Sequence, residues 1–296
     1  MKKWHELWDR KGEMIEIESE REKKFPFLHL FLFIATLFGT MIAGSLQEGV
    51  NPISQPYLIY KGLPFSLTLM LILGVHETGH YITSKRNGVQ ATLPYFIPAP
   101  SFLGTFGAFI KMKSLIPNRR VLLKIGAAGP LAGFAVALPS TIIGLMLSEV
   151  REPSAVSSGI SLGSSLLLSF LTKSILGVSN DSADILLHPV AFAGWIGLFV
   201  TALNLLPIGQ LDGGHIIFAL SRRLHNLLSK IAFLLLLPLG FFWEGWLIWA
   251  AAIFIFGINH PPVVDETPSL SKEDRILAAV AIIIFVITFI PVPFKL

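Results

Sequence analysis

Residues 63–84 have the sequence LPFSLTLMLILGVHETGHYITS, which is mostly apolar and long enough to cross a membrane as a single helix. Its second half carries three ionisable side chains close together, His76, Glu77 and His80. Each such group costs about 2.5–3.5 kcal/mol near the centre of a bilayer on insertion scales, so the three need a compensating partner. This stretch therefore predicts a transmembrane helix that carries a polar site.

The whole chain has the composition of a membrane protein. Of its 296 residues, 53% are hydrophobic and 14% are charged, whereas soluble domains carry about 25% charged residues. Long apolar stretches alternate with short polar ones, which predicts one all-α polytopic transmembrane domain over residues 26–296, with a motif-bearing core at about 63–215. We expect about seven transmembrane helices, near residues 26–45, 63–84, 121–147, 189–208, 226–241, 243–259 and 275–293.

The distribution of basic residues predicts the orientation of this multi-pass protein. Seven Lys or Arg residues precede the first expected span, only Lys61 lies between the first and the second, and Lys85 and Arg86 follow the second. Basic residues favour the cytosolic side, so residues 1–25 are expected to form a charged cytosolic tail. The second span then ends inside, with its histidines toward the cytosolic half of the bilayer. Because the basic residues flank spans, the net charge of +4 does not indicate nucleic-acid binding.

The polar site in residues 63–84 has the pattern of a zinc centre. His76 and His80 are four positions apart, so they lie on one face of a helix and can share one zinc ion. Glu77 can serve as general base, because zinc lowers the pKa of a water molecule that it binds and a carboxylate can take the proton. A chance match to this short HExxH pattern is the alternative. The membrane setting makes a chance match less favoured. Three ionisable groups are costly in a bilayer, and a bound divalent cation would offset that cost.

Two histidines and a water molecule leave zinc one ligand short, and the chain has no cysteine to supply it. The best candidate is Asp212, at the end of an expected span and directly before Gly213 and Gly214, which free the backbone to turn. The alternative is that Asp212 caps a helix beginning near His215. We expect one zinc ion per chain, held by two histidines and this aspartate.

Two segments are expected to depart from the transmembrane helix pattern. The loop 85–120 is rich in Gly, Pro and aromatic residues, and residues 104–113 alternate as a strand does, which predicts a small membrane-associated β-hairpin. The segment 160–178 is apolar but interrupted. The zinc ligands must share one depth, so the span 189–208 must end inside, and the span 121–147 already brings the chain outside. Residues 160–178 are therefore expected to be re-entrant or interfacial.

The HExxH helix, together with the downstream motifs Asn204-Leu205-Leu206-Pro207 and Leu211-Asp212-Gly213, resembles the site-2 protease family of intramembrane zinc metalloproteases. The resemblance covers residues 74–215 and looks closest to the branch shared by archaea, cyanobacteria and plastids. Further matches are Gly104-Thr105-Phe106-Gly107, Gly129-Pro130-Leu131-Ala132-Gly133 and the stretch from His188 to Trp195.

The resemblance implies an intramembrane zinc endopeptidase that hydrolyses transmembrane or membrane-proximal segments of other proteins, as in regulated intramembrane proteolysis. It implies His76, His80 and Asp212 as ligands, Glu77 as base and Asn204 as a catalytic polar group near the reacting carbonyl. The family's hairpin resembles residues 104–110 and would pair with an unwound substrate. The substrate-binding candidates are Gly104, Phe106, Gly107, Ala108 and Phe109. The expected partners are a transmembrane protein or peptide substrate and membrane lipid, while the sequence indicates no particular oligomeric state.

Two other functions compete with this one. A membrane-anchored zincin with a glutamate as third ligand is disfavoured, because no later glutamate, Glu244 included, lies in a comparable setting. A transporter would also place His, Asp and Asn inside the membrane, but the internal repetition expected of one is not found. The other histidines, His188, His215 and His260, are read as structural, with a supporting contact to Asp212 as the alternative for His215.

Overall fold

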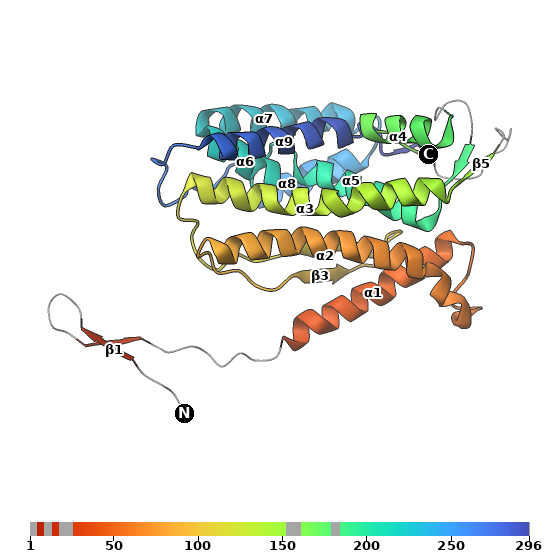
Figure 1. Cartoon of the computed structure of the whole chain (residues 1–296), viewed down its shortest axis with the longest axis horizontal. Coiled ribbons are helices and arrows are strands. Elements are labelled where there is room, and N and C mark those ends of the chain that lie inside the picture. Colours follow the sequence, from red (N-terminus) through yellow and green to blue (C-terminus); the bar gives the residue numbers. More distant parts are fainter. Residues whose placement is uncertain (1–4, 9–13, 18–25, 152–160, 179–183, 296) are drawn as a thin grey trace.

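The computed structural model describes residues 5–8, 14–17, 26–151, 161–178 and 184–295 (Figure 1). Most of the expected tail 1–25 lies outside these ranges. Its two described pieces, β1 (His5–Trp8) and β2 (Met14–Ile17), are antiparallel strands paired with each other.

The described part of the chain is mostly helical, as predicted. Three segments are long and apolar enough to cross a membrane: α1, the unit formed by a short 3₁₀ helix (Pro56–Gly62) and α2, and α3. The other expected spans correspond to shorter or more polar helices, so the count of seven stays a prediction. The helices are α1 (Phe27–Gln47), α2 (Leu63–Arg86), α3 (Arg119–Met146), α4 (Leu166–Leu176), α5 (Pro189–Asn204), α6 (Asp212–Leu220), α7 (Arg222–Leu239), α8 (Gly245–Phe256) and α9 (Lys272–Thr288).

Helix α5 ends earlier than predicted, at Asn204 and not at residue 208. The sequence continues Leu205-Leu206-Pro207, and proline can neither donate a backbone hydrogen bond nor fit its ring into a continuing helix. The chain instead turns and begins α6 at Asp212. This early end places the polar residue Asn204 at the tip of a helix, where it can face the site.

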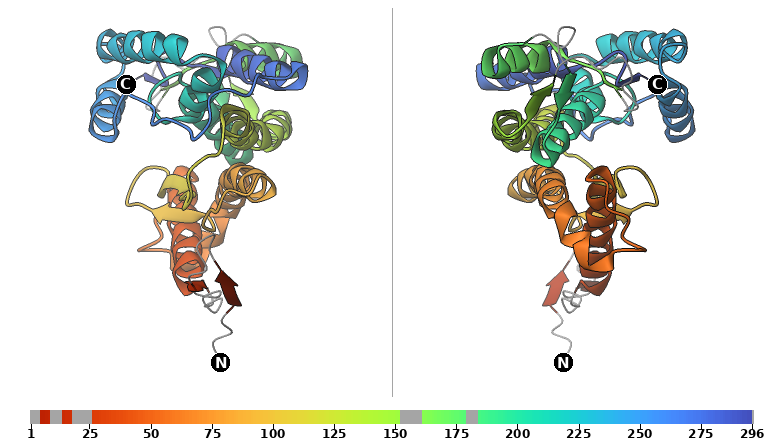
Figure 2. Two further views of the ribbon diagram at one scale, coloured as in Figure 1. Left: turned by 90° about the vertical axis from the view of Figure 1, so that its left-hand side faces the viewer. Right: turned by 90° about the vertical axis from the view of Figure 1, so that its right-hand side faces the viewer.

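Helix α3 is the central element of the fold (Figures 1 and 2). It packs against α2 on one side and against α5, α6 and α9 on the other. Small residues allow the close approach: a Cβ atom on Gly79 of α2 would lie 2.6 Å from the carbonyl oxygen of Ala128 on α3. At its amino end, Arg120 Nε donates to Asp274 Oδ2 at 2.9 Å, which fastens α3 to α9.

The predicted hairpin is present between α2 and α3. Strand β3 (Tyr95–Pro98) pairs with β4 (Thr105–Phe109) in an antiparallel register, with an irregularity after Phe96. Helix α1 packs against β3. The turn before β4 approaches α1 so closely that a Cβ atom on Gly104, whose φ is +75°, would lie 2.3 Å from the carbonyl oxygen of Gly39. The hairpin is thus held between α1 and α2.

The segment between α3 and α5 has its two ends side by side, because the strand that follows α3 pairs with the strand that precedes α5. Strand β5 (Glu149–Arg151) pairs with β7 (Asp184–Leu186), and β6 (Ser161–Leu162) pairs with β8 (Phe294–Lys295) near the carboxyl end. Helix α4 has 11 residues, a length of about 16 Å at 1.5 Å per residue, which is roughly half the hydrocarbon thickness of a bilayer. Alone it is too short to cross.

Candidate metal centre

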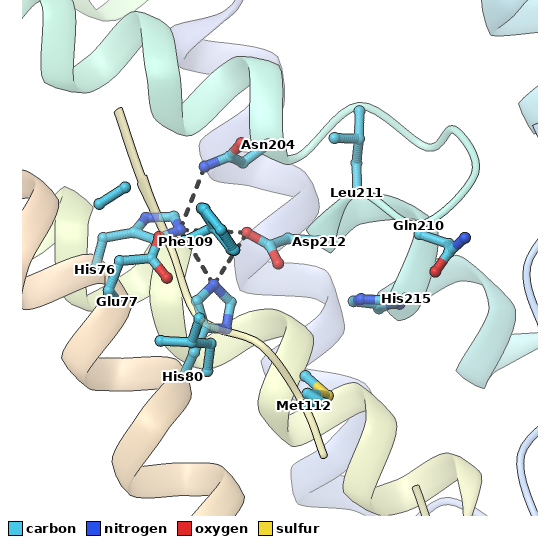
Figure 3. A pocket seen from close by; sticks show the side chains of 12 residues that line it. His76, Glu77, His80, Phe109, Met112, Asn204, Gln210, Leu211, Asp212 and His215 are labelled. Atoms are coloured by element: carbon cyan, nitrogen blue, oxygen red, sulfur yellow. Dashed lines mark hydrogen bonds and ion pairs between the residues drawn. The ribbon is translucent and has the colours of Figure 1, made fainter. Parts of the chain in front are cut away.

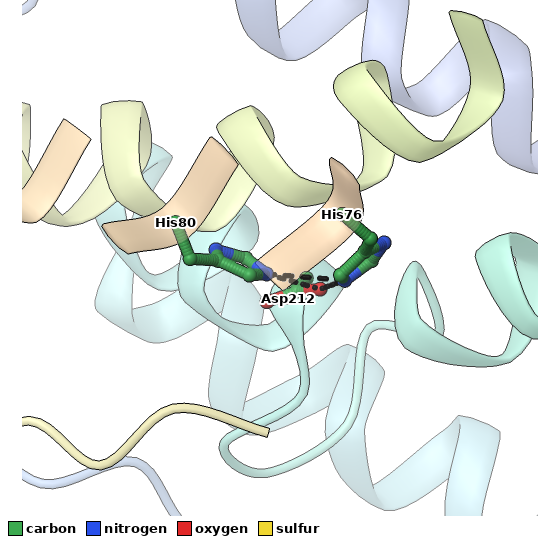
Figure 4. Close-up of side chains that lie close together, drawn as sticks. All are labelled: His76, His80 and Asp212. Atoms are coloured by element: carbon green, nitrogen blue, oxygen red, sulfur yellow. Dashed lines mark hydrogen bonds and ion pairs between the residues drawn. The ribbon is translucent and has the colours of Figure 1, made fainter. Parts of the chain in front are cut away.

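The structure brings the three predicted ligands together, although 132 positions separate His80 from Asp212 (Figure 4). The Nε2 atoms of His76 and His80 lie 3.1 Å apart. Each of them lies 3.3 Å from Asp212 Oδ2. Both histidines are buried and Asp212 is partly buried. Within the described residues, this is the one group of three or more His, Cys, Asp or Glu side chains with converging ligand atoms.

The spacing of these atoms fits zinc. A tetrahedral zinc ion with bonds of about 2.0–2.1 Å to its ligands holds neighbouring ligand atoms about 3.3 Å apart. The three observed separations, 3.1, 3.3 and 3.3 Å, match that value. The donor set of two imidazoles and one carboxylate is also one that zinc uses in catalytic sites, where the fourth position stays open.

Helix α3 fixes the direction of His80. The Nδ1–H group donates to the backbone carbonyl of Ile125 at 2.8 Å, so Nε2 is left to face His76 and Asp212. The ring lies directly on Gly129, where an added Cβ atom would come within 2.0 Å of Nε2. This glycine therefore makes room for an imidazole of the site.

The turn between α5 and α6 positions the carboxylate of Asp212 at the site. The N-cap residue of α6 is Leu211, and Asp212 is the first residue of the helix, so the alternative that Asp212 caps this helix is wrong. Gly213 and Gly214 lie inside the first turn of α6, so they do not form the bend between α5 and α6. They instead allow the backbone of the preceding segment to approach the helix closely. A Cβ atom on Gly213 would lie 2.0 Å from the carbonyl oxygen of Leu205. The bend itself uses Gly209, whose φ is +53°.

A pocket opens beside the three ligands (Figure 3). Glu77 lines it and is buried, and Ile110 from the end of the hairpin lines the same pocket. Asn204 enters from the end of α5, with its Nδ2 atom 3.3 Å from His76 Nε2. All five residues predicted for the metal and the chemistry therefore lie around one cavity.

The predicted substrate-binding residues divide into two groups. Ala108 and Phe109 line the pocket. Phe106 is 74% exposed, and Phe106, Gly107 and Gly104 are not among the residues of the pocket wall. Gly104 instead precedes β4 and packs on α1. Ile110, at the end of the predicted substrate strand 104–110, also lines the pocket. Sequence reasoning missed three further wall residues, which come from the end of the hairpin and from the α5–α6 turn: Met112, Gln210 and Leu211.

The remaining histidines have defined places. His188 is the N-cap of α5, and its Nδ1 accepts from the backbone N–H of Val190 at 3.3 Å, as the structural interpretation expects. His215 lines the pocket, and its Nδ1 lies 2.6 Å from Nε2 of His260. The hydrogen bond that its side chain makes is thus to His260 and not to Asp212.

The sequence matches peptidase family M50 over residues 64–242, which is more than half of the chain and includes every residue of this site. The chain belongs to peptidase family M50. This is the site-2 protease family, so the resemblance predicted from the motifs is confirmed. Zinc is the metal of this family's relatives, in agreement with the ligand spacing.

Plant members of the M50 family resemble the chain over most of its length. The Arabidopsis thaliana protein named "Probable zinc metalloprotease EGY2, chloroplastic" is 30% identical over 264 residues, which cover 88% of this chain and 47% of the relative. The japonica rice EGY2 protein is 31% identical over 80% of this chain and 44% of its own length. The Arabidopsis EGY1 protein is 32% identical over 78% and 43%.

The chain spans about half the length of the curated relatives it matches. No solved structure matches it.

Proposed function

We propose that this chain is an intramembrane zinc endopeptidase that hydrolyses peptide bonds in transmembrane or membrane-proximal segments of other proteins. The observation that carries the proposal is the convergence of His76, His80 and Asp212 beside the buried carboxylate of Glu77. Helix α2, which carries the two histidines and the glutamate, belongs to a segment long and apolar enough to cross a membrane. Bound zinc would supply Lewis acidity that activates water and polarises a carbonyl group. The remaining chemistry belongs to the side chains around it.

Glu77 is the proposed general base. It follows His76 on α2, lines the same pocket as the ligands and is shielded from solvent. After taking a proton from the attacking water, the same carboxyl group can pass it to the nitrogen of the leaving amine. This is possible because the water oxygen and that nitrogen lie on the same side of the scissile bond.

Asn204 is proposed to stabilise the oxygen of the reacting carbonyl. The Nδ2 atom of its amide group lies 3.3 Å from His76 Nε2. When His76 is a zinc ligand, the lone pair of Nε2 is used for the metal and cannot accept this hydrogen bond. The amide N–H group is then available to another acceptor in the pocket. A carbonyl oxygen that gains negative charge is the strongest acceptor that the reaction brings there.

A substrate must unwind before it can reach this site. The pocket has a volume of about 230 Å³. In an α-helix the backbone N–H and C=O groups bond to each other, so the scissile carbonyl of a helical segment is not free to react. Unwinding inside a membrane leaves backbone groups without partners at a cost of several kcal/mol each, so the enzyme should offer replacements.

The open edge of β4 can supply these hydrogen bonds. The Gly107 N–H donates to Thr105 Oγ1 at 2.9 Å, and that hydroxyl donates to the Ile97 carbonyl of β3 at 2.8 Å. The Gly107 N–H therefore faces β3. Backbone groups alternate along a strand, so those of Ala108 face the opposite, open edge. Ile110 follows the same alternation, and it lines the same pocket as Glu77. This edge therefore leads directly to the proposed base.

Ala108→Pro is expected to reduce cleavage at least about fivefold while zinc content and thermal stability stay close to the wild-type values. The substitution removes one backbone donor from the open edge, which leaves a buried substrate carbonyl unsatisfied at about 1–3 kcal/mol. Ala108→Ser is the matched control, because it keeps the N–H group. Cleavage of a membrane-inserted peptide, zinc analysis and thermal unfolding check the prediction. Full cleavage by a folded, zinc-loaded Ala108→Pro chain would remove strand addition from the proposal.

The proposed topology has seven crossings, a cytosolic amino terminus and the site toward the cytosolic half of the bilayer. Helices α3 and α9 start at the same end of the molecule, where Arg120 binds Asp274 (Figure 1). The pairing of β5 with β7 supports the proposal that residues 160–178 do not cross the membrane alone.

The decisive experiment is cleavage of a transmembrane peptide by the purified chain in liposomes, with and without a zinc chelator. The proposal predicts defined fragments that disappear with the chelator and return with added zinc. The competing transporter function predicts ion or solute flux across the same liposomes and no fragments.

A further inference from the structure

The pocket extends beyond the metal ligands to a second polar group (Figure 3). On the side away from His76 it is lined by Gln210, Leu211, His215 and Met112. His215 lies three positions after Asp212 on α6, so both side chains project from the same turn of that helix. A substrate segment that passes the proposed metal site along the strand leading to Met112 would therefore meet His215 within a few residues of the cleaved bond.

A hydrogen-bond chain fixes which nitrogen of His215 carries the proton. The carbonyl of Pro261 can only accept, so His260 donates to it through Nδ1–H. His260 Nε2 must then accept the bond from His215 Nδ1, 2.6 Å away, when both rings are neutral. The consequence is that His215 Nε2 carries a lone pair and no proton.

Burial favours the neutral form of both rings. Burial lowers the pKa of His215 to about 3, with repulsion from His260 in the same direction. Burial also lowers the pKa of His260 to about 4, against the opposing effect of its bond to the Pro261 carbonyl. Stacking of Phe218 on His260, with ring centroids 4.2 Å apart, holds the second ring in place.

We propose that His215 Nε2 forms a specificity subsite for a substrate side chain with an uncharged hydrogen-bond donor, such as a Ser or Thr hydroxyl near the cleaved bond. Among the described residues, no hydrogen-bond partner is found for this nitrogen. Leu211 and Met112 supply apolar walls beside it, and Gln210 supplies a further polar group. Thr, which combines a methyl group with a hydroxyl, suits such a site better than its isostere Val. This inference rests on the proposed function, because that function makes the ligand of the pocket a peptide.

The test measures binding and not turnover, so that it does not depend on cleavage. Peptides with Thr or Val at each of three positions on either side of a central bond are titrated against the zinc-loaded Glu77→Gln chain in detergent. At one position Thr is expected to bind about fivefold more tightly than Val, the effect of one net hydrogen bond. Adding His215→Phe, which keeps a ring but no acceptor, is expected to bring that ratio to one.

His260→Phe provides a second variant outside the pocket wall. It removes the acceptor that orients His215 and is expected to reduce the same ratio, and ¹⁵N-histidine NMR should then show the loss of the fixed Nδ1–H form of His215. Each ratio compares two peptides on one chain, so a general loss of affinity cancels. Equal Thr and Val affinities at every position, or a preference unchanged by His215→Phe, would overturn the subsite. Peptide binding without any cleavage by the wild-type chain would instead count against the proposed function.

Discussion

Glu77→Gln is expected to reduce peptide hydrolysis by about 10²–10⁴-fold while the chain still binds one zinc ion. The amide has nearly the same shape as the carboxylate, but it cannot take a proton from water, and general-base catalysis typically contributes a factor of this size. Zinc should remain because Glu77 is not among the converging ligand atoms of His76, His80 and Asp212. Cleavage assays and zinc analysis on the same purified sample check both halves.

The ligand variants provide the contrast. His80→Ala or Asp212→Ala should lose zinc and cleavage together, since each removes one of three protein ligands. The assignment of roles would be contradicted by a Glu77→Gln chain that folds but has lost its zinc. It would be contradicted equally by an Asp212→Ala chain that keeps full activity.

Gly129→Ala is expected to weaken zinc binding at least about 100-fold, although the residue is neither a ligand nor polar. The new methyl group would lie 2.0 Å from His80 Nε2, and no real contact is that short. Helix α3 cannot move away easily, because α5, α6 and α9 pack on its other side. The imidazole must therefore leave its position and give up the bond to the Ile125 carbonyl.

Gly74→Ala is the matched control for this prediction. It lies on α2, two residues before His76, and its added methyl group would meet only the ring of Phe96 at 3.7 Å, an ordinary contact. Its zinc affinity should equal that of the wild type. Zinc competition with a chromophoric chelator measures both variants. Equal affinities for Gly129→Ala and wild type would show that His80 is not held against α3 as described.

The parts of the site that the sequence predicted are those governed by local rules. Helical periodicity places His76 and His80 on one face, and the need for a third oxygen or nitrogen ligand singles out Asp212. Apolar length predicts where the long helices lie. The alternation of residues 104–113 predicts the hairpin, which is present.

The parts that the sequence did not predict depend on how distant elements meet. The contact of Gly129 with His80 requires the register between α2 and α3. The pairing of His215 with His260 joins a helix to a loop 45 positions away. Gly104 illustrates the same difficulty, because its positive φ is a local property but its contact with Gly39 depends on the position of α1.

Zinc K-edge X-ray absorption on the purified wild-type and Asp212→Ala chains tests the central claim most directly, because it reports the ligands of the metal itself. We predict one zinc ion per wild-type chain with two imidazole ligands at about 2.0–2.1 Å, oxygen in the remaining positions and no sulfur. The Asp212→Ala chain should lose the metal. A wild-type spectrum with fewer than two imidazoles, or an unchanged spectrum after Asp212→Ala, would contradict a zinc centre built from α2 and α6.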